Sequence, residues 1–161
     1  MKNHRAVCAL TLLGLVLLAV SCRSKPPYEG KSVSELEQML EDPSPAVQAQ
    51  GAYGLGQLGA EARSAVPALA KALKADSALV REYAARALGL IGPDARAAVG
   101  ELMAALKDTG WAVRRQAALA LGQIGPDARA SLAALQQLSQ DSNEPVRAAA
   151  REALQKIRPQ K

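Results

Sequence analysis

The stretch Val80–Gly92, with the sequence VREYAARALGLIG, contains the pattern that decides the fold of this 161-residue chain. Its apolar residues recur every 33 residues in both directions. The shared positions are Val47, Val80, Val113 and Val146, then Leu55, Leu88, Leu121 and Leu154, and then Leu58, Ile91, Ile124 and Ile157. A repeat of this length is typical of a solenoid of stacked helical pairs, because one pair alone is unable to bury its apolar face. The sequence therefore predicts an all-α array of about four units.

Eight helices are predicted from the spacing of the apolar residues and from the residues that begin and end each run. They span residues 33–41, 45–58, 64–74, 78–91, 97–107, 111–124, 130–139 and 144–157. Every second helix follows a residue type that favours helix N-caps, namely Ser44, Ser77, Gly110 and Asn143. Gly59, Gly92 and Gly125 come just after the last apolar residue of three helices, where a left-handed cap requires glycine.

The second unit predicts which helix side is buried. At 100° per residue from Val80, the side chains of Ala84, Ala87, Leu88 and Ile91 share one arc, the width of a core-facing stripe. Beside that arc lie Ala85 and Gly89, small residues that would let adjacent helices approach closely. In the last unit the same two positions hold Arg151 and Gln155, which would make the final face of the array polar, as a soluble solenoid requires.

A family resemblance follows from these repeats. The stretches Val80–Gly92 and Val113–Gly125 share the form VRxxAAxALGxIG, and the GPDAR joints Gly92–Arg96 and Gly125–Arg129 follow directly. Together they resemble the HEAT-like repeats first described in phycobilisome lyases. The resemblance covers residues 33–157 and places the repeat domain at 32–161. It implies a right-handed α-solenoid, and it implies a protein-binding scaffold more often than an enzyme.

The same resemblance implies a ladder of charges along the stack. In it, the arginine near each helix start would pair with the aspartate of the preceding joint. The arginines are Arg81, Arg114 and Arg147, and the aspartates are Asp76, Asp108 and Asp141. Gln48 interrupts the ladder in the first unit, and Asp76 lies one residue out of step. We interpret these charges as structural.

The first residues are typical of a targeting segment rather than of a fold. Lys2 and Arg5 precede an uncharged run of 15 residues, Ala6–Val20, which is shorter than the ~20 residues of a membrane-spanning helix. Leu18–Cys22 resembles the lipobox of bacterial lipoproteins, which implies removal of residues 1–21 and lipid attachment at Cys22. Residues 22–31 would then be a lipidated tether. The alternative is an ordinary secretory signal that leaves Cys22 as a free thiol.

This resemblance implies a location in the cell envelope, with the lipid in the outer membrane or in the outer face of the cytoplasmic membrane. Beyond residue 21 the chain has 18 basic and 15 acidic residues, a balance that requires no nucleic-acid partner. The only histidine is His4, and the only cysteine other than Cys22 is Cys8, inside the targeting segment. We therefore expect no metal, no cofactor, no small-molecule substrate and no enzymatic activity.

A protein partner in the envelope is the favoured role, and three aromatic residues are the candidate partner surface. They are Tyr53, Tyr83 and the only tryptophan, Trp111; side chains of this kind are enriched at interface hot spots. Tyr53 is the favoured surface residue, because Tyr83 and Trp111 are also compatible with packing against neighbouring helices. Two alternatives stay open: an enzyme or enzyme subunit similar to the phycobilin lyases, and a purely structural envelope lipoprotein.

Overall fold

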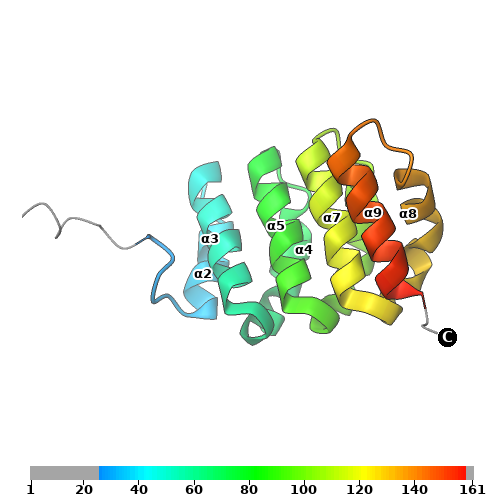
Figure 1. Cartoon of the computed structure of the whole chain (residues 1–161). Helices are drawn as coiled ribbons and strands as arrows, with labels where there is room; N and C mark the ends of the chain where they lie inside the picture. The colour runs from blue at the N-terminus through cyan, green and yellow to red at the C-terminus, as the bar shows by residue number, and fades with distance from the viewer. Residues whose placement is uncertain (1–25, 159–161) are drawn as a thin grey trace, which may run out of the picture.

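The computed structural model describes residues 26–158, which form a stack of helix pairs (Figure 1). The α-helices are α2 (Val33–Leu40), α3 (Pro45–Leu58), α4 (Val66–Ala72), α5 (Ala78–Ile91), α6 (Val99–Ala105), α7 (Trp111–Ile124), α8 (Leu132–Leu138) and α9 (Glu144–Ile157). Three 3-10 helices join the pairs: η1 (Gly59–Ala65), η2 (Gly92–Ala98) and η3 (Gly125–Ser131). The predicted all-α solenoid of helical repeats is confirmed over this part of the chain.

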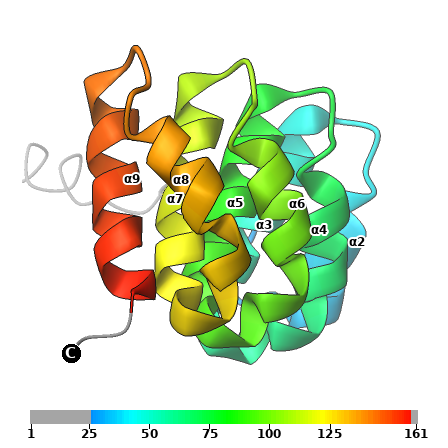
Figure 2. The same ribbon diagram turned by 90° about the vertical axis from the view of Figure 1, so that its right-hand side faces the viewer.

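The helices form two layers, and the longer ones make a continuous row. Helices α3, α5, α7 and α9 have 14 residues each and lie side by side, with α2, α4, α6 and α8 behind them (Figures 1 and 2). These four long helices have the predicted bounds. They begin after residues with extended backbone, and three of them end at glycines with φ between 54° and 76°, a region that favours glycine.

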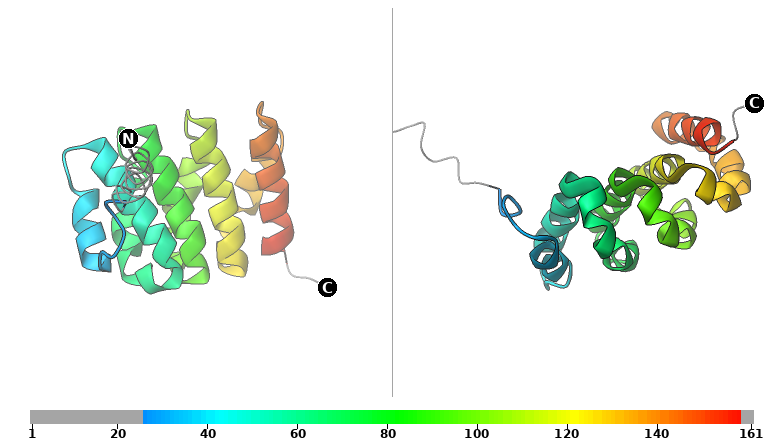
Figure 3. Two further views of the ribbon diagram at one scale, coloured as in Figure 1. Left: turned by 60° about the vertical axis from the view of Figure 1, so that its left-hand side comes forward. Right: turned by 90° about the horizontal axis from the view of Figure 1, so that it is seen from below.

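Glycine and alanine set the spacing of the long-helix row. A Cβ added at Gly122 would lie 2.9 Å from the Cα of Ala153, and one at Gly89 would lie 3.1 Å from the Cα of Ala120. The predicted close approach through small residues is therefore confirmed. The long helices pack directly on one another, whereas the shorter helices contact mainly the long helices and the 3-10 segments. The stack is consequently tighter along the long-helix row, which lies on the inner side of its curve (Figure 3).

The core runs through the whole stack without a break. In the second unit Ala84, Ala87, Leu88 and Ile91 are at most 3% exposed, which confirms the predicted helical phase. The equivalent leucines Leu55 and Leu121 are fully buried as well.

The joints after the long helices differ from the prediction. We expected the following helices to start at residues 64, 97 and 130. Instead, the seven residues after each of α3, α5 and α7 form a 3-10 helix, which continues into the next α-helix. The reason is packing inside the joint. Ala62, Ala95 and Ala128 are completely buried there, so the chain stays wound against the core rather than crossing in an open loop.

The first end of the array is closed by residues that precede α2. Ser32 and Glu35 form a capping box, with Ser32 N–H donating to Glu35 Oε2 at 2.8 Å and Glu35 N–H to Ser32 Oγ at 3.3 Å. Tyr28 packs on α3 near Gly54, where an added Cβ would lie 2.8 Å from the Cβ of Tyr28. Within the predicted tether, Tyr28 therefore belongs to the folded end.

At the last end, Arg151 and Gln155 are exposed on α9, as expected for a polar final face. Among residues 26–158 no helix is long and apolar enough to cross a membrane. The predicted signal segment 1–21 and the predicted lipid-attachment residue Cys22 lie outside the described residues.

Candidate functional site

The exposed sides of α3, α5, α7 and α9 form one surface, here called the long-helix face. A row of three tyrosines crosses its first part. The ring centroids of Tyr28 and Tyr53 are 4.9 Å apart and those of Tyr53 and Tyr83 are 5.6 Å apart, both in edge-to-face arrangements. The guanidinium carbon of Arg86 lies 5.3 Å from the centroid of the Tyr53 ring, in the range of a cation–π contact. These contacts join α3 to α5.

Helix α5 adds apolar side chains to this face. Leu79 and Leu90 are both 49% exposed, although large aliphatic side chains in a packed repeat are usually buried. At the same repeat positions α3 has Ala46 and Gln57, and α7 has Ala112 and Gln123. The apolar surface is therefore a property of the second unit and not of the repeat pattern.

The structure brings two of the three predicted surface aromatics together. Tyr53 and Tyr83 are half-buried neighbours in the tyrosine row, whereas Trp111 stands at the start of α7 without an aromatic partner among residues 26–158. The sequence favoured Tyr53 as the surface residue, but Trp111, at 49% exposure, is the more exposed of the two. Tyr28 was missed, although it is the only other tyrosine and lies just before the first helix.

A groove of about 540 Å³ lies between α5 and α7 on the long-helix face. Its apolar lining comes from Leu90 and Leu119, and small residues form its floor between the helices. Its polar lining consists of Arg86, Arg115, Gln116, Gln123 and Glu152. Glu152, on α9, is paired with Lys156 at 2.7 Å.

A second set of polar contacts lies at the N-terminal ends of the long helices and connects the repeats. Arg81 Nε and Nη2 donate to the two carboxylate oxygens of Asp108 at 2.7 and 3.0 Å. Its Nη1 donates to the carbonyl oxygens of Ala75 and Asp76, both at 2.8 Å. Arg114 makes the same bidentate pair with Asp141, at 2.8 and 3.0 Å. All four side chains are only 10–15% exposed.

The predicted ladder is therefore present, but its pairing is wrong by one joint. Arg81 and Arg114 each pair with the aspartate that precedes the next long helix, and they reach the segment before their own helix through backbone carbonyls. Asp76 contributes its carbonyl oxygen there. Arg147, in the last unit, pairs with Glu144 of its own helix and donates to the carbonyl oxygen of Asp141.

Three aspartates, two of them in the ladder, hold the backbone just before three of the long helices. The N–H groups of Ser44, Gly110 and Asn143 donate to Asp42, Asp108 and Asp141 respectively, each at 2.8 Å. The predicted N-cap residues occupy the cap positions, but none of their side chains makes the cap bond. At three of these positions the aspartate two residues earlier instead accepts from the cap residue's own N–H, which fixes the turn that enters the helix.

These contacts change the acidity of the aspartates. The hydrogen bond from Arg114 lowers the pKa of Asp141 from 3.8 to about 2, although burial acts in the opposite direction. Burial raises the pKa of Asp108, but the bonds from Arg81 and from the Gly110 N–H outweigh it and hold that pKa below its ordinary value. Both carboxylates are therefore charged at neutral pH and act as structural anions.

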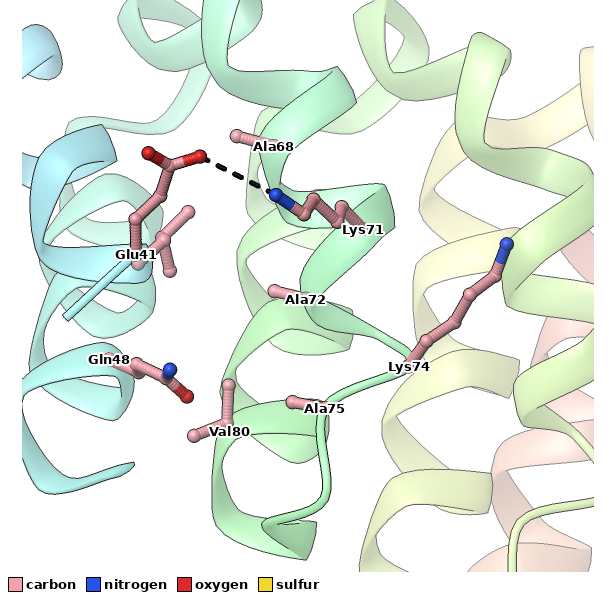
Figure 4. Close-up of a pocket in the computed structure, with 9 residues that line it drawn as sticks. Glu41, Gln48, Ala68, Lys71, Ala72, Lys74, Ala75 and Val80 are labelled. Atoms are coloured by element: carbon pink, nitrogen blue, oxygen red, sulfur yellow. Dashed lines mark hydrogen bonds and ion pairs between the residues drawn. The ribbon is translucent and has the colours of Figure 1, made fainter. Parts of the chain in front are cut away.

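The first junction of the array lacks this pair, and a larger pocket lies there. Gln48 replaces the arginine and Ala75 replaces the aspartate, so both partners are missing together. The pocket has about 520 Å³ and is lined by Gln48, Ala75 and Val80 among others (Figure 4). The equivalent pocket two repeats on, bordered by Asp141, has about 220 Å³. Above the first pocket Lys71 pairs with Glu41 at 3.5 Å, in the solvent.

Comparison with known families agrees with this geometry. The family model described as HEAT repeats matches residues 33–99 and 66–155, which together include almost all of the described helices. The chain is a HEAT-repeat protein. The match identifies HEAT repeats in general and specifies no subtype. A comparison with curated protein sequences finds no match.

Solved structures similar to this HEAT-repeat protein include natural and engineered solenoids. An engineered protein is 29% identical, with a TM-score of 0.66 over 78% of this chain and 62% of its own. A designed armadillo repeat protein in complex with the peptide (KR)4 is 22% identical, with a TM-score of 0.69 over 78% of this chain and 64% of its own. Human deoxyhypusine hydroxylase, in complex with glycerol, is 34% identical, with a TM-score of 0.60 over 82% of this chain and 45% of its own. The HEAT-repeat chain thus spans less than two thirds of each.

Within residues 26–158 the HEAT-repeat array has no group of three or more His, Cys, Asp or Glu side chains placed to hold a metal ion. Its acidic residues are instead distributed among the joints and helix surfaces. Apart from the first-junction pocket, whose ladder pair is missing, the features that depart from the repeat pattern are the apolar side of α5, the tyrosine row and the groove beside it. All three belong to the long-helix face, which is therefore the candidate functional site.

Proposed function

We propose that this HEAT-repeat protein is a lipid-anchored scaffold of the cell envelope that binds another protein through its long-helix face. The observation that carries the proposal is the exposure of Leu79 and Leu90 on α5, at positions where α3 and α7 carry alanine and glutamine. With Tyr83 between them, these leucines give one side of α5 an apolar stripe that α3 and α7 lack, and contiguous exposed apolar surface marks interaction sites. HEAT and armadillo-like scaffolds are typical protein- and peptide-binding folds.

The neighbouring aromatic residues also favour the long-helix face as the binding surface. Tyr53 and Tyr83 are held by edge-to-face contacts, so they present a preformed surface with little side-chain freedom left to lose on binding. Trp111 would extend the contact to the start of α7. Preformed aromatic side chains are the ones that most often contribute hot-spot energy.

The anchor in this proposal is a lipid on Cys22. Tyr28, which packs on the first end of the array, comes only six residues later in the chain. Even a fully extended segment of that length reaches about 20 Å, so an anchored array would keep its first end close to the membrane. Replacing Cys22 with Ser should abolish lipidation and release the protein into the soluble fraction. Continued retention in the membrane fraction of the variant would refute the anchor.

We also propose that the protein has no catalytic activity of its own. Its single histidine, His4, and both cysteines belong to the predicted targeting segment or to the anchor. The alternative of a phycobilin-lyase-like enzyme predicts covalent attachment of a bilin. Incubation with a bilin, followed by denaturing electrophoresis, should give no coloured band.

Photocrosslinking in cells tests the binding face. A benzophenone amino acid at Leu79 or Leu90 should give one dominant adduct, and the same probe at Gln136, which is exposed on α8, should not. Adding Tyr83→Gln to the Leu90 probe variant should weaken its adduct, because the substitution removes an aromatic contact from the binding face. Glutamine occupies that position in α3 and α7, so it is compatible with the fold. Diffuse adducts from α5, or the same adduct from Gln136, would favour a purely structural envelope component instead.

A further inference from the structure

We propose that the groove between α5 and α7 binds a protein segment that presents carboxylates beside apolar side chains. This inference rests on the proposed function, since it specifies the chemistry of the partner on the long-helix face. It depends on two arginines, Arg86 and Arg115, and on the apolar lining between them.

The charge in this groove is unbalanced, unlike the charge elsewhere on the long helices. Among residues 26–158, Arg86 and Arg115 take part in no ion pair, and the one carboxylate that lines the groove, Glu152, is already paired with Lys156. In contrast, the other arginines of the long helices all have carboxylate neighbours: Arg81, Arg114, Arg147 and Arg151. The groove therefore carries two arginines that have no ion pair within residues 26–158.

Both arginines are placed to bind an anion. Arg86 is exposed, but its guanidinium lies against the Tyr53 ring, which limits its orientations. Arg115 is half-buried in the wall of α7. A guanidinium binds a carboxylate through two parallel hydrogen bonds, and the chain itself uses this geometry twice, in Arg81–Asp108 and Arg114–Asp141.

The rest of the groove fits the apolar part of such a segment. Leu90 and Leu119 offer aliphatic surface, and the small residues Ala85, Gly89 and Ala120 form a floor without large side chains. The volume of about 540 Å³ lies within the range of about 300–1,000 Å³ typical of ligand sites. A segment with leucine-like side chains next to Asp or Glu therefore complements the groove in both shape and charge.

An anionic membrane is the competing occupant, and the structure favours it less. A lipid surface is flat and would bind exposed cations irrespective of their place in a groove. The exposed lysines Lys71, Lys74 and Lys107 lie on and after α4 and α6, in the other layer. A membrane would therefore not select the long-helix face, whereas a protein segment that fills the groove would.

Fluorescence anisotropy with the full-length protein in detergent tests the proposal. The probe is a fluorescein-labelled peptide of alternating Asp and Leu, compared with peptides of alternating Ser and Leu and alternating Lys and Leu. We expect saturable binding of the acidic peptide only, weakened by salt because the contact is electrostatic. Arg86→Gln and Arg115→Gln should each raise the dissociation constant about tenfold, the effect of losing a charged hydrogen bond.

The matched control removes the same charge elsewhere. Arg96→Gln and Arg129→Gln change exposed arginines in η2 and η3, outside the groove, and should leave binding unchanged. Thermal melting of every variant checks that the fold is kept. Equal weakening by the control pair, or equal binding of the Ser–Leu peptide, would overturn the proposal. So would groove-dependent binding to phosphatidylglycerol vesicles without peptide binding.

Crosslinking from Leu90 separates this proposal from the proposed function. If crosslinking captures one partner but the acidic peptide does not bind, the scaffold function stands and the acidic chemistry is wrong. If crosslinking gives no defined partner and the peptide also fails, both are wrong.

Discussion

The first junction of the array, between α3 and α5, is held together differently from the two that follow. The later junctions each contain a nearly buried arginine–aspartate pair, Arg81–Asp108 or Arg114–Asp141. The first has Gln48 and Ala75 at those positions and a pocket of about 520 Å³. On the long-helix face the first junction is the one with the additional contacts, since only it has the tyrosine row.

This difference shows how a repeat array can carry both a uniform fold and a local site. The leucine, alanine and glycine positions are kept in all junctions, so every junction has the same spacing. The later junctions have an arginine–aspartate pair and the first junction has the tyrosine row instead, and this difference leaves the spacing unchanged. The first two units, where the pattern is relaxed, also carry the exposed apolar residues Leu79 and Leu90.

The largest effect should come from removing a ladder carboxylate. Asp108→Ala leaves Arg81 nearly buried without its partner and removes the hydrogen bond to the Gly110 N–H before α7, and we expect a loss of about 3 kcal/mol in the free energy of unfolding. Asp42→Ala is the matched control, because the Asp42 carboxylate makes only the equivalent bond to the Ser44 N–H before α3; it should cost about 1 kcal/mol. Urea denaturation measures both. Equal losses would mean that the pair with Arg81 adds nothing to the hydrogen bond with the Gly110 N–H.

The second-largest effect should come from acid, which lowers the free energy of unfolding that the later junctions contribute. The folded-state pKa of Asp141 is about 2, below its ordinary value of 3.8, so its contribution is complete above pH 5 and is lost as the pH falls toward 2. The shift corresponds to about 2 kcal/mol. In Arg114→Gln, which removes the main cause of the shift, unfolding free energy should fall less steeply between pH 5 and pH 2.5. A slope equal to that of the parent protein would contradict the assignment.

The sequence predicted the long helices completely, because repeated apolar positions, cap residues and glycines all specify the same bounds. It failed where the partner lies in another repeat. Arg81 is 27 residues before Asp108, and nothing in the spacing distinguishes the following joint from the preceding one. The 3-10 form of the joints was also missed, since it depends on alanines whose burial is decided by the neighbouring unit. The Tyr53–Tyr83 contact, in contrast, follows from the repeat register once the packing direction is known.

Grafting the ladder into the first junction should give a smaller change of opposite sign. Gln48→Arg with Ala75→Asp recreates the pair of the later junctions, and we expect a gain of about 1 kcal/mol in unfolding free energy. Gln48→Arg alone should be destabilising, because it places a positive charge in a part-buried site without its carboxylate. A double-mutant cycle measures the coupling between the two positions. Zero coupling would mean that the first junction differs from the others in more than these two side chains.

The smallest effect is expected at the surface of that same junction. Lys71 and Glu41 form the ion pair across the rim of the first pocket, but their side chains are 81% and 74% exposed. Exposed pairs of this kind contribute about 0–1 kcal/mol, and salt screens them further. Lys71→Gln with Glu41→Gln should therefore change the unfolding free energy by less than about 0.5 kcal/mol. A larger loss would show that this pair replaces the missing ladder and that the first junction is as strongly connected as the others, by a different route.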